Sequence, residues 1–145
     1  MNILVLHGPN LCFLGKREPE VYGTMTLEDV SEKIRRYARK ARIQAKIFHS
    51  NCEGCLIDLM FQHWGWADGI VLNPGAYTHY SYALRDAVKA CGIPTVEVHL
   101  SDIRKREMFR RKSVIAPVCK AQVMGKGWES YIEGMKLLIK GFSKK

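Results

Sequence analysis

The chain opens with Ile3-Leu4-Val5-Leu6, a run of four apolar residues, and continues at once with His7-Gly8-Pro9-Asn10-Leu11. The apolar run is typical of a short strand that is buried on both faces. The residues after it show no helical or alternating period, and Gly and Pro interrupt them until Thr26. A segment of this length without a regular pattern is uncommon in a compact domain unless it covers a binding site. The start of the chain therefore predicts a buried strand followed by a lid.

Strand and helix patterns alternate along the rest of the chain. Thr26 and Asp29 form a capping-box pattern at the start of one helix, and we expect Asn51 to cap a second. Gly92 and Pro94 mark the end of a third. The expected strands are residues 3–6, 45–48, 70–72, 95–98 and 118–124, and the expected helices carry apolar stripes over residues 27–41, 56–63, 83–91 and 128–139.

This alternation predicts an α/β fold in which helices cover both faces of a parallel sheet. Five strands in 145 residues suit a flavodoxin-like three-layer sandwich with strand order 2-1-3-4-5, and residues 1–145 suit a single domain. Ligands of such sheets bind outside the carboxyl ends of the strands. The loops at that edge begin at His7, Asn73 and His99.

The composition is that of a soluble globular protein, with 47% hydrophobic and 26% charged residues. No apolar run reaches the roughly 20 residues of a membrane span. The chain enters a strand pattern at once, so we expect no signal peptide and a cytoplasmic location. Five cysteines is an odd number, and they lie in or beside apolar segments, so we expect reduced thiols. Cys52 and Cys55 form one C-x-x-C pair, which is too few ligands for structural zinc; incidental cysteines and redox chemistry both stay open.

The net charge of +9 is concentrated in residues 33–42 and 104–112. A solvated helix face explains the first cluster, whereas the second follows the expected site and suits an anionic ligand. No nucleic-acid motif accompanies the charges, so we expect no nucleic-acid partner. A flavodoxin-like module that binds flavin or nucleic acid is the rival interpretation. Residues 8–11 are a poor phosphate loop for it, because proline lacks an N–H donor.

The first loop carries groups suited to base catalysis, namely Asn10, Arg17 and Tyr22. A phenol is a poor base at neutral pH, because its pKa lies near 10. A nearby guanidinium lowers that pKa, and a reduction of about three units requires roughly 4 kcal/mol of differential stabilisation. Arg17 is five residues before Tyr22, so a folded loop can bring the two together.

The other two loops carry groups suited to acid catalysis and to binding. Glu97 and His99 are two apart on an expected strand and so lie on one face, where a carboxylate can orient the imidazole as an acid. The loop from Asn73 to His79 adds an amide and a second imidazole. Each residue alone has an ordinary structural explanation, and the prediction rests on their convergence. A Tyr base and a His acid suit proton abstraction beside a carbonyl followed by loss of a hydroxyl.

Longer motifs then resemble one family over essentially the whole chain. The most specific are Asn73-Pro74-Gly75-Ala76-Tyr77-Thr78-His79 and Glu97-Val98-His99-Leu100-Ser101, and residues 8–11, 14–19, 22–23, 50–51, 53–54, 56–58, 83–86, 106–107 and 109–110 complete the pattern. The chain resembles the type II 3-dehydroquinases (3-dehydroquinate dehydratases). The resemblance implies a flavodoxin-like fold and dehydration of 3-dehydroquinate to 3-dehydroshikimate, with no metal and no cofactor. This reaction serves either the shikimate pathway of aromatic biosynthesis or quinate catabolism.

The resemblance also implies a role for each site residue. In this assignment, Tyr22 is the base and Arg17 keeps it ionised. His99 protonates the departing hydroxyl, and Glu97 holds the His99 side chain. Asn10 helps to hold a water that stabilises the enolate. The implied substrate-binding residues are Asn73, Gly75, His79, Asp86, Leu100, Ser101 and Arg110.

Family members assemble as trimers grouped into dodecamers, and the resemblance implies that Asp86 reaches the site of a neighbouring subunit. Leu100 and Ser101 would bind the substrate carboxylate through their main-chain N–H groups, and Arg106 would serve structure or an interface. The chain departs from the pattern at Tyr80, where the family usually has a small hydroxyl residue. We expect Tyr80 to narrow or reorganise the edge of the pocket.

Overall fold

The strands form one parallel sheet in the order β2-β1-β3-β4-β5. The computed structural model describes residues 1–16 and 18–143, with the main chain alone at residues 19 and 22. The strands are β1 Asn2–His7, β2 Gln44–His49, β3 Gly69–Asn73, β4 Thr95–Val98 and β5 Ala121–Val123. The predicted α/β class and strand order are therefore confirmed.

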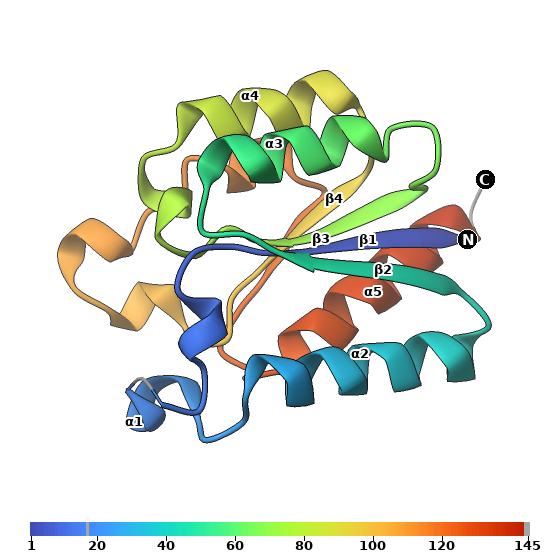
Figure 1. The fold of residues 1–145 in the computed structure, drawn as a ribbon. Helices are drawn as coiled ribbons and strands as arrows, with labels where there is room; N and C mark the ends of the chain where they lie inside the picture. The colour runs from blue at the N-terminus through green and yellow to red at the C-terminus, as the bar shows by residue number, and fades with distance from the viewer. Residues whose placement is uncertain (17, 144–145) are drawn as a thin grey trace.

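Helices cover both faces of the sheet (Figure 1). The helices are α1 Pro19–Tyr22, α2 Leu27–Ala41, α3 Glu53–Gln62, α4 Tyr82–Cys91 and α5 Glu129–Phe142. Side chains alternate between the two faces of β1: Ile3 and Val5 pack in one core cluster with α2 and α5, whereas Leu4 and Leu6 pack in the other with α3 and α4. The four-residue apolar run is thus buried on both sides, as its composition predicts.

The strands at the centre of the sheet end together. His7, the last residue of β1, lies beside Asn73 of β3 and His49 of β2. Strands β2 and β3 pair with opposite edges of β1. The carboxyl ends of β1 and β3 are therefore the topological switch point. This edge is where a doubly wound sheet leaves a crevice for a ligand.

The helix starts confirm one capping prediction and correct another. At α2, the Thr26 side chain accepts the N–H of Asp29 and the Asp29 carboxylate accepts the N–H of Thr26, which is the predicted capping box. The prediction that Asn51 caps α3 is wrong, because Cys52 occupies the N-cap. The Asn51 side chain instead accepts the main-chain N–H of Asn10 at 2.9 Å, a contact between distant segments that local sequence does not encode.

Two other segments differ from the prediction. The sequence predicts a fifth strand over residues 118–124, but Ala116–Val118 form a 3₁₀ turn with Pro117 in it, and strand pairing is limited to Ala121–Val123. The first loop is also more structured than its lack of a period suggests, since Leu11–Phe13 form a 3₁₀ turn and α1 adds one helical turn. Both turns are too short to leave a periodic pattern.

None of the helices in the described part of the chain has the length and apolar character needed to cross a bilayer. All five cysteines are free thiols, as predicted.

Candidate active site

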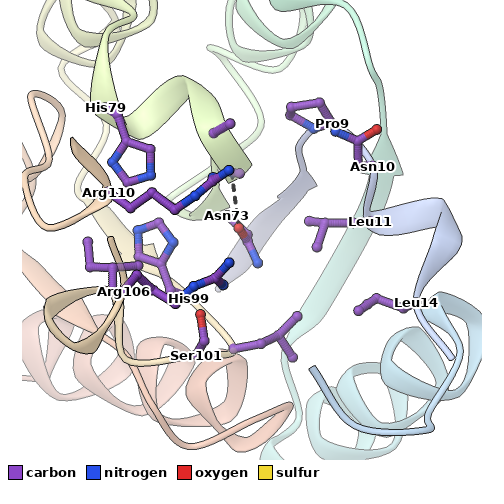
Figure 2. Close-up of a pocket in the computed structure, with 14 residues that line it drawn as sticks. Pro9, Asn10, Leu11, Leu14, Asn73, His79, His99, Ser101, Arg106 and Arg110 are labelled. Carbon is purple, nitrogen blue, oxygen red and sulfur yellow. Dashed lines mark hydrogen bonds between the residues drawn. The ribbon is translucent and has the colours of Figure 1, made fainter. Parts of the chain in front are cut away.

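A pocket of about 190 Å³ lies at the carboxyl ends of the central strands. Its walls come from Pro9, Asn10, Leu11, Leu14, Asn73, Gly75, Ala76, His79, His99, Leu100, Ser101, Ile103, Arg106 and Arg110. In Figure 2, His79, His99, Arg106 and Arg110 line one side, Pro9 to Leu14 of the first loop line the other, and Asn73 lies between them. The three loops that begin at His7, Asn73 and His99 therefore converge.

Glu97 and His99, the predicted acid pair, are in direct contact. Glu97 on β4 is fully buried, and its Oε1 lies 2.6 Å from Nε2 of His99. Burial alone would raise the pKa of Glu97, but hydrogen bonds from His99, Thr78 and Ser113 outweigh it and lower the pKa. The carboxylate is therefore ionised at neutral pH. Because this carboxylate accepts a hydrogen bond from Nε2, neutral His99 carries its proton on that nitrogen. When the ring is protonated, Nδ1 carries the second proton and can donate it to a ligand.

Two hydroxyl groups complete the shell around this carboxylate. Thr78 donates to Glu97 Oε1, and Ser113 Oγ lies 3.0 Å and 2.9 Å from the two carboxylate oxygens. Ser113 also accepts the N–H groups of Ile115 and Ala116, at 3.1 Å and 2.8 Å. These two N–H groups occupy both lone pairs of Ser113 Oγ, so the hydroxyl of Ser113 must donate its proton to Glu97. Sequence reasoning missed Ser113, because it lies in a segment with no period that only the fold brings to β4.

His79 faces the pocket in a defined tautomer. Its Nδ1 lies 2.8 Å from the main-chain carbonyl of Lys112, which can only accept, so Nδ1 carries the proton. Burial, followed by the charges of His99 and Arg110, lowers the pKa of His79. The neutral ring keeps an acceptor at Nε2 for a ligand hydroxyl.

Asn73 is held in one orientation by groups on both sides of it. Its Oδ1 accepts the N–H of Gly75 at 3.1 Å, and its Nδ2 donates to the hydroxyl of Tyr131 at 3.0 Å. Tyr131, on α5, is fully buried and lies 2.7 Å from Nδ1 of His7. Burial, with a smaller contribution from His49, lowers the pKa of His7 to about 3, so the ring is neutral and its Nδ1 can accept the tyrosine hydroxyl. The second N–H of the Asn73 amide is left for a ligand.

Glycines allow the first loop to lie against the loop after β3. Gly75 has φ +56°, and a Cβ there would lie 3.1 Å from Pro9 Cδ. At Gly8 a Cβ would lie 2.7 Å from the Asn73 carbonyl oxygen, to which Gly8 itself donates its N–H. Larger residues would push the two walls of the pocket apart.

The pocket is positively charged on the side of the acid pair. Arg106 and Arg110 both line it, and both lie near the exposed carboxylate of Glu107, with N–O distances of 3.5 Å and 3.3 Å. Among the described residues, the main-chain N–H groups of Leu100 and Ser101 have no hydrogen-bond acceptor. The cations and open N–H groups together suit a small carboxylate ligand.

Fewer side-chain contacts are described for the lid than for the other two loops of the site. Arg17 lies outside the described residues, and Tyr22 is described only through the main chain of α1. A second cavity of about 460 Å³ adjoins the pocket, shares Leu14, Leu100, Ser101 and Arg106 with it, and is also lined by Val21 and Gly23. The main chain on both sides of Tyr22 thus borders the site. Asn10 lies at the rim with φ 66°, held by its N–H bond to Asn51.

Comparison with known proteins places the chain in one family. The family model described as Dehydroquinase class II matches residues 1–139. The chain belongs to the class II dehydroquinase family. A 3-dehydroquinate dehydratase of Pelotomaculum thermopropionicum is 53% identical over 136 residues, which cover 94% of each chain. One from Bacillus licheniformis is 55% identical over 130 residues, or 90% of each chain. The crystal structure of type II dehydroquinase from Butyrivibrio crossotus superposes with a TM-score of 0.94 at 45% identity, covering 96% of this chain and 97% of that one.

In this class II dehydroquinase, the positions of Arg106, Tyr80 and Asp86 relative to the pocket differ. Arg106, expected to serve structure or an interface, lines the pocket. Tyr80 is 60% exposed, packs edge-to-face against Tyr77, and is not among the residues that line the pocket, so within one chain it does not narrow the pocket. Asp86 is exposed on α4 and lies outside the pocket of its own chain. Its proposed role in a neighbouring site stays a prediction.

The two basic clusters differ as predicted. On α2, Arg35 lies 2.7 Å from Glu28 and Arg39 lies 2.7 Å from Glu32, which is a solvated face with exposed ion pairs. The second cluster contributes Arg106 and Arg110 to the pocket.

Proposed function

We propose that this pocket dehydrates 3-dehydroquinate to 3-dehydroshikimate by stepwise elimination through an enolate. The activity is that of a type II 3-dehydroquinate dehydratase, a hydro-lyase, as in the relatives named above. The observation that carries the mechanism is the buried Glu97–His99 pair, which opens into a cationic pocket. The reaction needs an acid at a leaving hydroxyl and a site for a carboxylate, and the pocket has groups suited to both.

In the first step, Tyr22 removes the proton from the carbon beside the ketone. Arg17 favours the phenolate form that this step requires. The electron pair moves onto the ketone oxygen, which becomes an enolate, and a water held with the help of Asn10 hydrogen-bonds that oxygen. The cavity beneath Val21 and Gly23 supports this assignment, because it adjoins the pocket.

In the second step, His99 donates a proton from Nδ1 to the hydroxyl on the neighbouring carbon. The enolate collapses, the C–O bond breaks, and water leaves as the ring gains a double bond conjugated with the ketone. Glu97 stabilises the imidazolium before the transfer and keeps the ring oriented after it. The hydroxyl groups of Thr78 and Ser113 hold the carboxylate in place.

The substrate is oriented by the remaining polar groups of the pocket. Its carboxylate accepts the N–H groups of Leu100 and Ser101. Its hydroxyls contact Asn73, His79 and Arg110. Gly75 supports this contact by fixing the Asn73 amide.

The assembly and the biological setting complete the proposal. The chain forms trimers that associate as a dodecamer, and Asp86 of one subunit borders the site of its neighbour; the exposed position of Asp86 on α4 is consistent with this arrangement. The enzyme acts in the cytoplasm, in aromatic biosynthesis or quinate breakdown. Light scattering during size-exclusion chromatography tests the assembly, and a monomer in solution would contradict it.

The activity has a direct test. The protein is mixed with 3-dehydroquinate and the conjugated enone product is followed by ultraviolet absorbance. Wild type should form product, and Tyr22→Phe should nearly abolish turnover while its circular dichroism spectrum stays native. Folded wild-type protein that forms no product would overturn the proposed function. Near-normal turnover by Tyr22→Phe would remove Tyr22 from the role of base.

A further inference from the structure

The C-x-x-C pair, which the proposed reaction does not use, lies at the start of α3. Cys52 is the N-cap, with φ −92° and ψ 126°, and Cys55 is in the first turn of a helix of ten residues. This helix follows β2, an edge strand of the parallel sheet, and both cysteines are exposed. A Cβ built on Gly54 would lie 3.9 Å from Cys52 Sγ, which places that sulfur over the first turn of the helix.

The two thiols have different environments. The Cys52 side chain makes no capping hydrogen bond, yet the main-chain N–H of Cys55, the Cys55 thiol and the N–H of Gly54 all lower the pKa of Cys52. Contact with Cys52 raises the pKa of Cys55. An exposed thiolate at a helix N-terminus is a nucleophile, and a thiol within reach of it can resolve a mixed disulfide.

From this arrangement we infer that Cys52 and Cys55 form a thiol–disulfide exchange site for small disulfides such as oxidised glutathione. The Cys52 thiolate attacks one sulfur of glutathione disulfide, forms a mixed disulfide and releases one glutathione thiolate. Cys55 then loses its proton and attacks the Cys52 sulfur, which releases the second glutathione. Two protein thiols are oxidised, one glutathione disulfide is reduced, and the two protein protons are taken up by the two glutathione thiolates.

The site is connected to the pocket through the residues beside it. Asn51 holds the N–H of Asn10 through its side chain at 2.9 Å, and its carbonyl accepts the Tyr77 hydroxyl at 2.8 Å. Glu53 accepts the hydroxyl of Ser81, the N-cap of α4. A disulfide between Cys52 and Cys55 would constrain the main chain that carries the contacts of Asn51 and Glu53. We therefore expect oxidation to raise KM for 3-dehydroquinate severalfold and reversibly, an effect that rests on the proposed function.

Mass spectrometry tests the exchange site without reference to activity. Reduced protein is incubated with oxidised glutathione at neutral pH, and the remaining thiols are alkylated. The peptide that contains Cys52 and Cys55 should lack two hydrogens and carry no label, and dithiothreitol should restore labelling. Cys12 is an exposed thiol with no cysteine three residues away, so it forms at most a mixed disulfide. A Cys52–Cys55 peptide that is alkylated at both cysteines, or that carries only glutathione adducts as Cys12 can, would overturn the inference.

Single variants separate the roles of the two thiols. Cys55→Ser should accumulate a mixed disulfide with glutathione on Cys52, whereas in Cys52→Ser, which keeps a good N-cap residue, Cys55 should stay open to alkylation. Cys12→Ser is the matched control and should still form the Cys52–Cys55 disulfide. Reduced Cys52 should also be alkylated faster than Cys55, because the pKa of the Cys52 thiol is lowered and that of the Cys55 thiol is raised. Equal amounts of mixed disulfide in the Cys52→Ser and Cys55→Ser variants would contradict the inference. A disulfide that forms without changing KM would contradict its link to the pocket.

Discussion

Replacing His7 should make the stability of the protein less sensitive to acid. His7 is 1% exposed, its Nδ1 accepts the Tyr131 hydroxyl, and its Nε2 has no hydrogen-bond partner in the described part of the chain. Burial lowers its pKa from 6.5 to about 3. The unfolded chain therefore binds a proton at His7 below pH 6.5, while the folded chain does not. Stability rises with pH wherever the unfolded state holds more protons.

The magnitude follows from these two pKa values. Between pH 8 and pH 5, protonation of His7 in the unfolded state should remove about 2 kcal/mol of stability, at roughly 1.4 kcal/mol per pH unit below the unfolded pKa. The loss continues until the pH reaches the folded pKa of about 3. Asparagine is the matched replacement, because its Oδ1 can accept the Tyr131 hydroxyl and it does not titrate.

The assay is urea unfolding of wild type and His7→Asn at pH 8 and pH 5. All samples have the same protein concentration, because the stability of an oligomer depends on the concentration of its subunits. Wild type should lose about 2 kcal/mol more than the variant between the two pH values. The other titrating groups are common to both proteins, and those that do not interact with His7 cancel in the difference. Equal losses would refute the claim that His7 is held neutral by burial.

Three further substitutions test the pocket. Glu97→Gln should lower kcat about 10- to 100-fold with little change in KM, because it removes a charge-assisted hydrogen bond to the acid; unchanged kcat in steady-state assays would contradict this. Gly75→Ala should lower the free energy of unfolding, measured with urea, by about 1–2 kcal/mol, because Gly75 has a positive φ and its added Cβ would contact Pro9. An unchanged urea midpoint would contradict the close approach of Gly75 to Pro9. Tyr131→Phe should raise KM about tenfold or more while kcat falls less, since Asn73 loses the partner that orients it; equal effects on both constants would indicate general damage.

The fold and the contact between Glu97 and His99 could be predicted because their determinants are local in sequence. The alternation of apolar runs and stripes predicts the sheet and its helices, and Thr26 with Asp29 predicts the start of α2. The two-residue spacing of Glu97 and His99 on a strand is enough to place both on one face. These inferences use only the periods of helices and strands.

Contacts between distant segments could not be predicted in this way. Ser113 reaches Glu97 from an irregular segment, and Tyr131 reaches Asn73 from a helix that packs beneath the sheet. Asn51 has the composition of a helix cap, but its side chain is used by Asn10 across 41 positions of sequence. Arg106 faces the pocket because the turns after β4 fold back over it. Each of these depends on the assembled tertiary structure rather than on a period or a local motif.

The central claim is that the base and the acid are separate groups that act in two steps. It is tested most directly by proton exchange in D₂O, with the recovered substrate examined by nuclear magnetic resonance. In His99→Gln, the base still acts but the hydroxyl cannot leave, so 3-dehydroquinate should gain deuterium beside its ketone while little product forms. Tyr22→Phe should show neither exchange nor product. If His99→Gln abolishes exchange as completely as Tyr22→Phe, proton abstraction and hydroxyl loss do not occur as the separate steps assigned to Tyr22 and His99.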